Sequence, residues 1–326
     1  MDRSGDRVLF ITSGNIGDAV LTTGLLRHFV ESEPQARFTI AAGPRALPLF
    51  ADTPRLERLI EVHKGRRAQH WLELWRQVAG RRWSAIIDMR GSALAFLLWA
   101  QRRYVYRSIR LAPGEAPPHK VLEAARTIGR LEQPPSPMLY ISATRQSHAD
   151  ALIGPGGPVL ALAPAATWPP KTWAGERFAE TALALLGPSG PLADGRALLI
   201  GGRDDGRFLE PLRAALPPSR VIDIAGLDLL TAYACLRRVR LFIGNDSGPM
   251  HLAAAAGAPT LGLFGPSDDR MYRPWGPQAA FIRATRTGGS PSDAGSMDAL
   301  SVAEVVRAAT ELLERTQAKD AAIAAV

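Results

Sequence analysis

The stretch LFIGNDSGPMHLAAAAGAPTLGLFGP, residues Leu241–Pro266, decides the fold that the sequence predicts. It predicts a buried strand, a tight polar turn, a helix, and a second buried strand that closes on Gly265-Pro266. The polar turn Asn245-Asp246-Ser247 follows the first strand, where the helix begins. The first N–H groups of a helix lack intrahelical partners and carry partial positive charge, so this position favours a phosphate.

The same alternation of strands and helices runs through all 326 residues and predicts parallel, doubly wound α/β sheets. The pattern breaks at Gly154–Pro158 (GPGGP) and then restarts, so we place a domain boundary within residues 142–158. We expect two Rossmann-like domains, residues 1–150 and 151–326, facing a central cleft. Ligands of such sheets bind outside the carboxyl ends of the strands. The expected strands are 7–12, 37–42, 58–62, 84–88 and 104–109 in the first domain, with helices at 19–32, 68–79 and 119–131.

Positive charge is concentrated in the first half of the chain. Residues 1–150 contain 22 Lys and Arg against 14 Asp and Glu, whereas residues 151–326 contain 17 of each. This excess predicts either a solvated basic face or contact with an anionic partner, such as a phosphorylated glycolipid at the surface of the inner membrane. Nucleic acid is disfavoured as a partner because no nucleic-acid-binding motif is present.

The apolar run near the first residues is only Val8–Ile11, so we expect no secretory signal, and no apolar run approaches the ~20 residues that span a bilayer. Its single cysteine, Cys235, excludes an internal disulfide and a cysteine-rich metal site. We therefore expect a cytoplasmic protein, with the membrane surface as a possible peripheral site.

Three kinds of chemistry fit the sequence poorly. Gly14 and Gly17 follow the first strand, but the second strand ends in Ala41–Pro44 (AAGP) without the acid that would hold a dinucleotide ribose. The six histidines lack the spacing of a metal hydrolase, and Asn245–Gly248 (NDSG) is not the Gly-x-Ser-x-Gly of a serine hydrolase. Hydride transfer is accordingly the weakest of the alternatives kept open.

Five stretches together resemble the heptosyltransferases of family nine of the glycosyltransferases. They are IGDAVLTTGLL (Ile16–Leu26), APAATWPPKTWAGERFAE (Ala163–Glu180), LIGGRDD (Leu199–Asp205), GNDSGPMHLAAAAGAPTLGLFGPSD (Gly244–Asp268) and SMDALSVAEVVRAATELL (Ser296–Leu313). The resemblance covers nearly the whole chain, in the family's order. The loop Thr285–Ser296 lacks the cysteines that many relatives carry there, which weakens assignment to the best-known subgroup.

The resemblance implies a GT-B fold and the transfer of a sugar from a nucleotide diphosphate, without metal or cofactor and with inversion at the anomeric carbon. Typical members transfer heptose from ADP-heptose to the inner core of lipopolysaccharide at the cytoplasmic face of the inner membrane. Two readings besides hydride transfer stay open: a transferase with a UDP or GDP donor, and a binding protein that keeps the nucleotide pocket without transferring.

The resemblance also implies two catalytic residues. Asp18 would be the general base that takes the proton of the acceptor hydroxyl; the alternative is that Asp18 caps the following helix. Lys171 would bind the donor phosphates and offset the charge that builds on the leaving diphosphate. The alternative for Lys171 is an exposed loop lysine.

The remaining implied contacts lie on the donor side. Thr167 fits a phosphate-binding hydroxyl, and Ser247 and Gly248 would present backbone N–H groups to the diphosphate. Asp246 would bind sugar hydroxyls or hold its turn, and His251 would contact phosphate or pack against Asp246.

Two further positions carry alternatives. Leu227 would lie against the nucleotide base, or else form ordinary core. Asp88, which ends a strand of the first domain, is a weaker candidate for the acceptor side.

Overall fold

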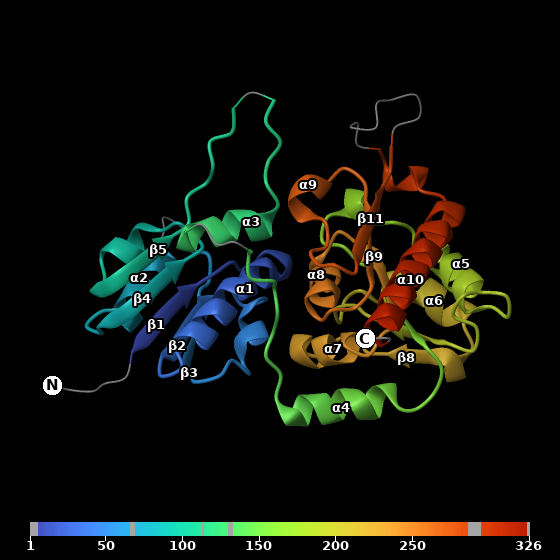
Figure 1. Cartoon of the computed structure of the whole chain (residues 1–326), viewed down its shortest axis with the longest axis horizontal. Helices are drawn as coiled ribbons and strands as arrows, with labels where there is room; N and C mark the ends of the chain where they lie inside the picture. Colours follow the sequence, from blue (N-terminus) through green and yellow to red (C-terminus); the bar gives the residue numbers. More distant parts are fainter. Residues whose placement is uncertain (1–5, 66–68, 113, 130–132, 286–294, 325–326) are drawn as a thin grey trace. The chain divides into compact units, whose positions relative to one another are not determined.

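The computed structural model describes residues 6–65, 69–112, 114–129, 133–285 and 295–324. It divides into two compact units, unit 1 (Met1–Ser142) and unit 2 (Ala143–Val326), each built around its own parallel sheet (Figure 1). The division falls at the start of the expected boundary, because residues 143–153 form helix α4, which packs against helix α7 (Leu229–Leu236) of unit 2.

Unit 1 contains a five-stranded parallel sheet in the order β3-β2-β1-β4-β5. The central strands β1 and β4 are almost wholly buried, as expected for strands covered on both faces. Its elements are β1 (Arg7–Ile11), α1 (Ile16–Ser32), β2 (Arg37–Ala42), η1 (Leu47–Phe50), β3 (Leu56–Glu61), α2 (Gln69–Val78), β4 (Trp83–Asp88), η3 (Ala93–Phe96), β5 (Ala100–Val105), α3 (Lys120–Ala125) and η4 (Arg126–Ile128), where η marks a short 3₁₀ helix.

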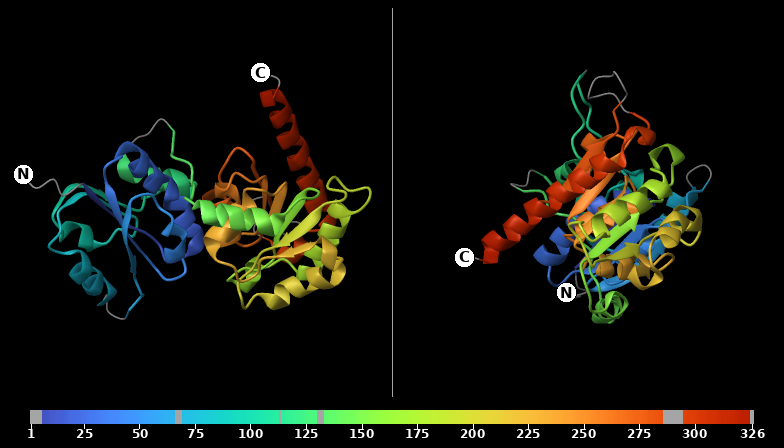
Figure 2. Two further views of the ribbon diagram at one scale, coloured as in Figure 1. Left: turned by 90° about the horizontal axis from the view of Figure 1, so that it is seen from below. Right: turned by 90° about the vertical axis from the view of Figure 1, so that its right-hand side faces the viewer.

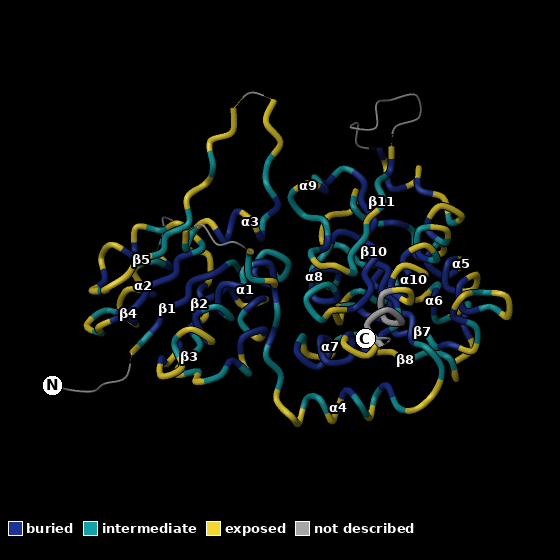
Figure 3. The backbone as a smooth tube through the Cα atoms, viewed as in Figure 1, coloured by how far each residue is buried: buried dark blue, intermediate teal, exposed yellow. Residues whose placement is uncertain are grey.

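Helices cover both faces of this sheet. α1 packs with α3. On the opposite face, Leu74 and Val78 of α2 share one buried cluster with Leu94 and Leu98 of the segment that connects β4 to β5. Figure 3 shows the result as buried strands inside a more exposed outer layer.

Unit 2 contains a six-stranded parallel sheet in the order β11-β10-β9-β6-β7-β8. The long helix α10 packs on it through its first turns, and its second half extends beyond the sheet (Figure 2). The remaining elements are β6 (Val159–Ala163), η5 (Pro169–Lys171), α5 (Gly175–Leu186), β7 (Arg196–Leu199), α6 (Gly206–Ala215), η6 (Pro218–Arg220), β8 (Val221–Asp223), β9 (Leu241–Asn245), α8 (Gly248–Ala255), β10 (Thr260–Phe264), α9 (Asp269–Tyr272), β11 (Ala279–Arg283), η7 (Met297–Ala299) and α10 (Val302–Ala324).

Each sheet has one switch point, where successive connections leave in opposite directions. In unit 1 it lies between β1 and β4, and in unit 2 between β6 and β9. The loops that follow these strands are where a doubly wound sheet receives its ligand. The predicted doubly wound fold is thus confirmed. A ligand is expected at the carboxyl edge of each sheet, beside its switch point.

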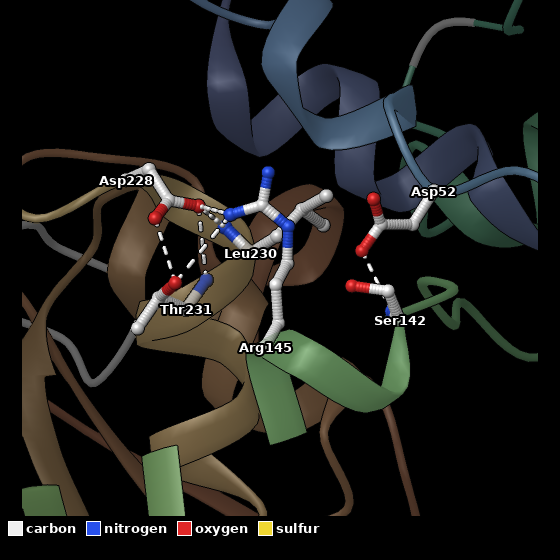
Figure 4. A network of polar contacts seen from close by, with 6 residues as sticks. All are labelled: Asp52, Ser142, Arg145, Asp228, Leu230 and Thr231. Atoms are coloured by element: carbon white, nitrogen blue, oxygen red, sulfur yellow. Dashed lines mark hydrogen bonds and ion pairs between the residues drawn. The ribbon is translucent and has the colours of Figure 1, made fainter. Parts of the chain in front are cut away.

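Both ends of the connection between the units are anchored within their own unit (Figure 4). In unit 1, the backbone N–H of Ser142 donates to Asp52 Oδ2 at 2.7 Å. In unit 2, the Arg145 guanidinium on α4 pairs with the carboxylate of Asp228, which caps α7 by accepting from the N–H groups of Leu230 and Thr231. These contacts fix α4 to unit 2 and exclude a structureless linker there.

Two expected elements were wrong in their bounds by more than three residues, while the helix expected at 19–32 begins at Ile16 and the strand expected at 58–62 is Leu56–Glu61. The strand expected at 104–109 is β5, Ala100–Val105; it lies at the sheet edge with half-exposed side chains, so it lacks an apolar run. The helix expected at 119–131 leaves α-helical geometry after Ala125 and ends at Gly129, whose φ is 110°. Most of the Gly/Ser-rich loop 285–296 lies outside the described residues. No helix in the described part of the chain is long and apolar enough to cross a membrane.

Candidate functional site

The polar groups of unit 2 gather at its switch point, after β6 and β9. Asn245, the last residue of β9, is fully buried. Its Nδ2 donates to the Pro164 carbonyl at 2.7 Å, and its Oδ1 accepts from the Trp173 N–H at 3.2 Å. One side chain therefore holds both ends of the loop that carries Lys171.

Lys171 ends the short helix η5 in this loop. Its Nζ lies 2.6 Å from Asp246 Oδ2. The Asp246 side chain is only 4% exposed and that of Lys171 is 26% exposed. The ammonium has three N–H donors and gives one to Asp246, so donors remain for a ligand on its exposed side. Lys171 is thus partly buried and fixed by an ion pair, unlike the exposed loop lysine that was the alternative.

His251 lies in the first turn of α8 and is buried. Its Nε2 is 3.9 Å from Asp246 Oδ1, on the other side of the carboxylate from Lys171. That distance is longer than a hydrogen bond, and the contact is an ion pair only when His251 is protonated. The structure therefore supports the packing of His251 against Asp246, and Asp246 lies between two basic groups.

Ser247 and Gly248 form the start of α8, as predicted. Ser247 occupies the N-cap position with extended backbone, yet its hydroxyl makes no capping bond to the helix. Among the described residues, the buried Oγ of Ser247 and Oγ1 of Thr172 have no hydrogen-bond partner. A buried hydroxyl without a partner costs about 1–3 kcal/mol. Thr39, Tyr140 and Ser267 carry such hydroxyls too, so the feature is not confined to this edge.

Two predicted donor contacts lie at the same edge without joining this cluster. Thr167 is exposed in the Lys171 loop. Leu227 is 37% exposed between Gly226 and the cap of α7, which excludes the core alternative. Leu227 follows β8, two strands from β6, and this corresponds to about 10 Å across the sheet.

The switch point of unit 1 carries Asp18. The residue lies in the first turn of α1 and is half-buried, whereas the N-cap position belongs to Asn15. Asn15 Nδ2 donates to Asp18 Oδ2 at 3.0 Å. The capping alternative for Asp18 is therefore wrong. The preceding turn is tight, because a Cβ on Gly43 would lie 2.6 Å from Gly14 Cα.

Asp88 is at the same edge but faces inward. It is fully buried, and its carboxylate accepts from the N–H groups of Arg90 and Ser92 at 2.8 and 2.9 Å. Burial raises the pKa of Asp88 and outweighs these hydrogen bonds. Asp88 thus shapes the loop after β4, and the weaker expectation that it lines the acceptor side is wrong.

Asn245 is the residue whose role the sequence did not reveal. It was part of the predicted polar turn, but an asparagine there predicts only a turn. The usable signal is that it ends an apolar strand, where a buried amide must find partners.

Two doubly wound units in one chain have the architecture of a GT-B glycosyltransferase. Solved structures share it. A family 9 glycosyltransferase from Veillonella parvula is 22% identical with a TM-score of 0.76, covering 95% of this chain and 98% of that one. ADP-heptose lps heptosyltransferase II from E. coli is 21% identical with a TM-score of 0.73, covering 95% and 99%.

The sequence comparison defines the family. The model of glycosyltransferase family 9 (heptosyltransferase) matches residues 118–296, more than half of the chain, so the chain belongs to this family of glycosyltransferases. It is also similar to the lipopolysaccharide core heptosyltransferase OpsX of Haemophilus influenzae, with 24% identity over 276 residues, 76% of either chain. The predicted family and enzyme class are thereby confirmed.

Proposed function

We propose that this glycosyltransferase transfers a heptose from ADP-heptose to an anionic glycolipid acceptor of the lipopolysaccharide-core type, with inversion and without a metal ion. The observation that carries the proposal is the Lys171–Asp246 pair, 2.6 Å apart at the switch point of unit 2, beside the start of α8 and two unpartnered hydroxyls. The names of the relatives support the donor and the acceptor class.

In the proposal, the carboxyl edge of the unit 2 sheet is the donor edge, and it binds the diphosphate of the donor through electrostatic attraction. In the proposed complex the diphosphate lies at the start of α8, where the Gly248 N–H and the helix dipole favour negative charge. Asp246 keeps the Lys171 ammonium in place, and the remaining N–H donors of Lys171 meet the phosphate. As the bond from the anomeric carbon to the diphosphate breaks, the leaving group gains charge, and a cation already in position stabilises it without reorganisation.

The acceptor edge supplies the base. An acceptor hydroxyl oxygen attacks the anomeric carbon from the face opposite the diphosphate and gives its proton to the Asp18 carboxylate. The electron pair of the broken bond leaves with ADP, and attack from the opposite face inverts the configuration. Asp18 suits this role because it is half-buried and one neighbour, Asn15, orients it.

The remaining donor-side residues take smaller roles in the proposal. Thr167 and Ser247 give hydroxyls to the phosphates, His251 supports Asp246, and the exposed Leu227 side chain packs against the adenine. Within the described residues, no three His, Cys, Asp or Glu side chains gather into a metal-binding group. Metal independence is tested by activity in excess chelator.

The deciding experiment is a screen of nucleotide sugars for acceptor-dependent release of nucleoside diphosphate. ADP-heptose should give release, and calorimetric titration should show ADP binding tighter than UDP, GDP and NAD. Release with a UDP- or GDP-sugar alone would replace the donor assignment. Tight NAD binding without ADP preference would overturn the proposal.

A further inference from the structure

Unit 1 exposes five large apolar side chains on one face. They are Leu72 and Trp75 of α2, which are 49% and 38% exposed, and Phe96, Leu97 and Trp99 of the β4–β5 connection, which are 58%, 70% and 55% exposed. Eleven large apolar side chains among the described residues are exposed to this degree. Exposed apolar groups are ordinary one at a time, but a contiguous group marks an interaction surface.

The topology places the two segments that carry these residues on the same face of the sheet. α2 leads from β3 into β4, and residues 89–99 lead from β4 into β5, so both run back along the same parallel strands. Both also bury their inner side chains in one cluster. Arg90 lies 5.2 Å from the Trp71 ring at one end of α2, and Arg82, just after α2, lies 4.9 Å from the Trp99 ring. The two segments are therefore joined near both ends. We call Leu72, Trp75, Phe96, Leu97 and Trp99 the α2–β5 patch; Figure 1 shows α2, β4 and β5 together.

The rim of the patch is cationic. Residues 69–105 contain six Arg against two acidic residues, the exposed Glu73 and the fully buried Asp88. Two of the six, Arg81 and Arg102, are paired with Glu57 and Glu33 from outside this range. Arg76, Arg82 and Arg90 are exposed around the patch. Within the described residues, Arg82 and Arg90 lie over tryptophan rings and form no ion pair with a carboxylate. A guanidinium stacked on an aromatic face still has N–H groups for phosphate.

The combination of apolar side chains and arginines favours one kind of partner, an anionic bilayer surface. Tryptophan rings with apolar neighbours and an arginine rim are typical of surfaces that lie at the headgroup level of a bilayer. A second copy of the same face would bring the two arginine rims together, which like-charge repulsion opposes. Charge complementarity therefore favours an anionic lipid surface over self-association.

We propose that the α2–β5 patch docks the chain on a bilayer that contains anionic phospholipid. Leu97, Phe96 and Trp99 enter the boundary between headgroups and acyl chains, and Arg82 and Arg90 contact lipid phosphates. The inference deepens the proposed function, because it supplies the surface on which a glycolipid acceptor would be met. Binding to vesicles needs neither donor nor acceptor, so it is measured independently of transfer.

The test is co-sedimentation of the full chain with vesicles of phosphatidylcholine alone and with about a quarter phosphatidylglycerol. We expect binding to the anionic vesicles only, and weakening with salt. Leu97→Ser and Leu72→Ser should each weaken it several-fold. Leu183→Ser on α5 of unit 2 is the matched control for Leu72→Ser, since Leu183 is 48% exposed. Arg82→Gln should cost about fivefold, whereas Arg207→Gln, which removes a guanidinium stacked on Phe208 in unit 2, should cost nothing.

Two results would overturn the inference. One is equal or absent binding to the two kinds of vesicle, or patch variants that bind like the control variants. The other is a concentration-dependent dimer, measured by light scattering, that Leu97→Ser dissociates; the patch would then be covered by a second copy. If vesicles bind but no nucleotide sugar is turned over, the proposed function fails and the docking surface stands.

Discussion

The carboxyl edges of the two sheets each contain one switch point, but they differ in how firmly their polar side chains are held. In unit 2, one buried asparagine holds both ends of the Lys171 loop, and Asp246 lies between Lys171 and His251. In unit 1, Asp18 takes a hydrogen bond from its near neighbour Asn15 and stays half-buried. Unit 2 thus holds its charged groups in place before a ligand arrives, and unit 1 keeps one carboxylate reachable.

This difference matches what each edge is proposed to do. A diphosphate carries several charges that must be met at fixed positions, and preorganised groups meet them at least cost. A general base needs only one carboxylate within reach of a hydroxyl. The family model matches residues 118–296 and so covers the unit 2 edge, while Asp18 lies outside the matched range.

The largest expected effect comes from removing the base. Asp18→Asn keeps the shape of the side chain but cannot accept the proton, so turnover should fall by about 10²-fold or more. ADP affinity, measured by calorimetry, should be unchanged because unit 2 is untouched. Glu31→Gln on the same helix removes one carboxylate from an exposed ion pair with Arg27 and is the matched control. Full turnover in Asp18→Asn would leave unit 1 without a base.

The next effect compares two lysines in similar ion pairs. Lys171–Asp246 and Lys120–Glu123 each span 2.6 Å, and the two lysine side chains are 26% and 25% exposed. Lys171→Met should lower ADP affinity and turnover by about 10- to 100-fold, because it removes the cation that meets the leaving diphosphate. Lys120→Met should lower neither.

Thermal melting separates binding from folding in this pair. Both lysine variants remove the lysine cation from a largely buried carboxylate, so both should destabilise the protein. Glu123 keeps its hydrogen bond from the Tyr106 hydroxyl in Lys120→Met. Equal loss of ADP affinity in the two variants would show that Lys171 acts only through stability.

A smaller effect compares two asparagines. Asn245→Ala removes two buried hydrogen bonds and leaves the Trp173 N–H unsatisfied, which should cost unit 2 about 2–3 kcal/mol. Asn15→Ala, at the exposed start of α1, should cost unit 1 about 1 kcal/mol or less.

Cys235 reports on unit 2 by itself. It is fully buried in α7, and burial raises its pKa to about 11. Its thiol should therefore react with a disulfide reagent only when the unit opens. Asn245→Ala should accelerate that reaction and Asn15→Ala should not; equal rates would mean that Asn245 does not hold the Lys171 loop.

The sequence predicted the repeating part of this fold and missed what depends on contacts far along the chain. Buried central strands such as β1, β6 and β9 are apolar runs that can be recognised without context. β5 was misplaced because an edge strand is exposed and polar. α4 was included in the boundary region because the Gly154–Pro158 break directly follows it. Only its packing against α7 makes α4 a stable helix.

The site residues also divide into those that the sequence identified and those whose role depends on contacts far along the chain. Asp18 and Lys171 came from the family resemblance and Ser247 from the polar turn before a helix, and the structure places each at a switch point. Asn245 acts on residues 72 and 81 positions away, and no local pattern carries that information. Asp88 was misjudged for the same reason, since a strand-ending aspartate is the same in sequence whether it faces a ligand or its own loop.

The smallest expected effect is a difference in acid titration between two aspartates, Asp88 of unit 1 and Asp228 of unit 2. Burial raises the pKa of Asp88 above its ordinary 3.8, so the folded protein holds this proton to higher pH than the unfolded chain does. The stability that Asp88 contributes is full below pH 3.8 and is lost as the pH rises through its folded pKa.

Burial tends to raise the pKa of Asp228 as well, but hydrogen bonds from Thr231 and the charge of Arg145 outweigh burial, and the pKa of Asp228 is lowered. Its contribution is full above 3.8 and is lost as the pH falls through its folded pKa. Carboxyl ¹³C chemical shifts, assigned with Asp88→Asn and Asp228→Asn, should show the two residues titrating on opposite sides of the ordinary value. A common midpoint would mean that the buried Asp88 and the paired Asp228 experience the same environment, and the contrast between an inward-facing carboxylate and a capping one would fail.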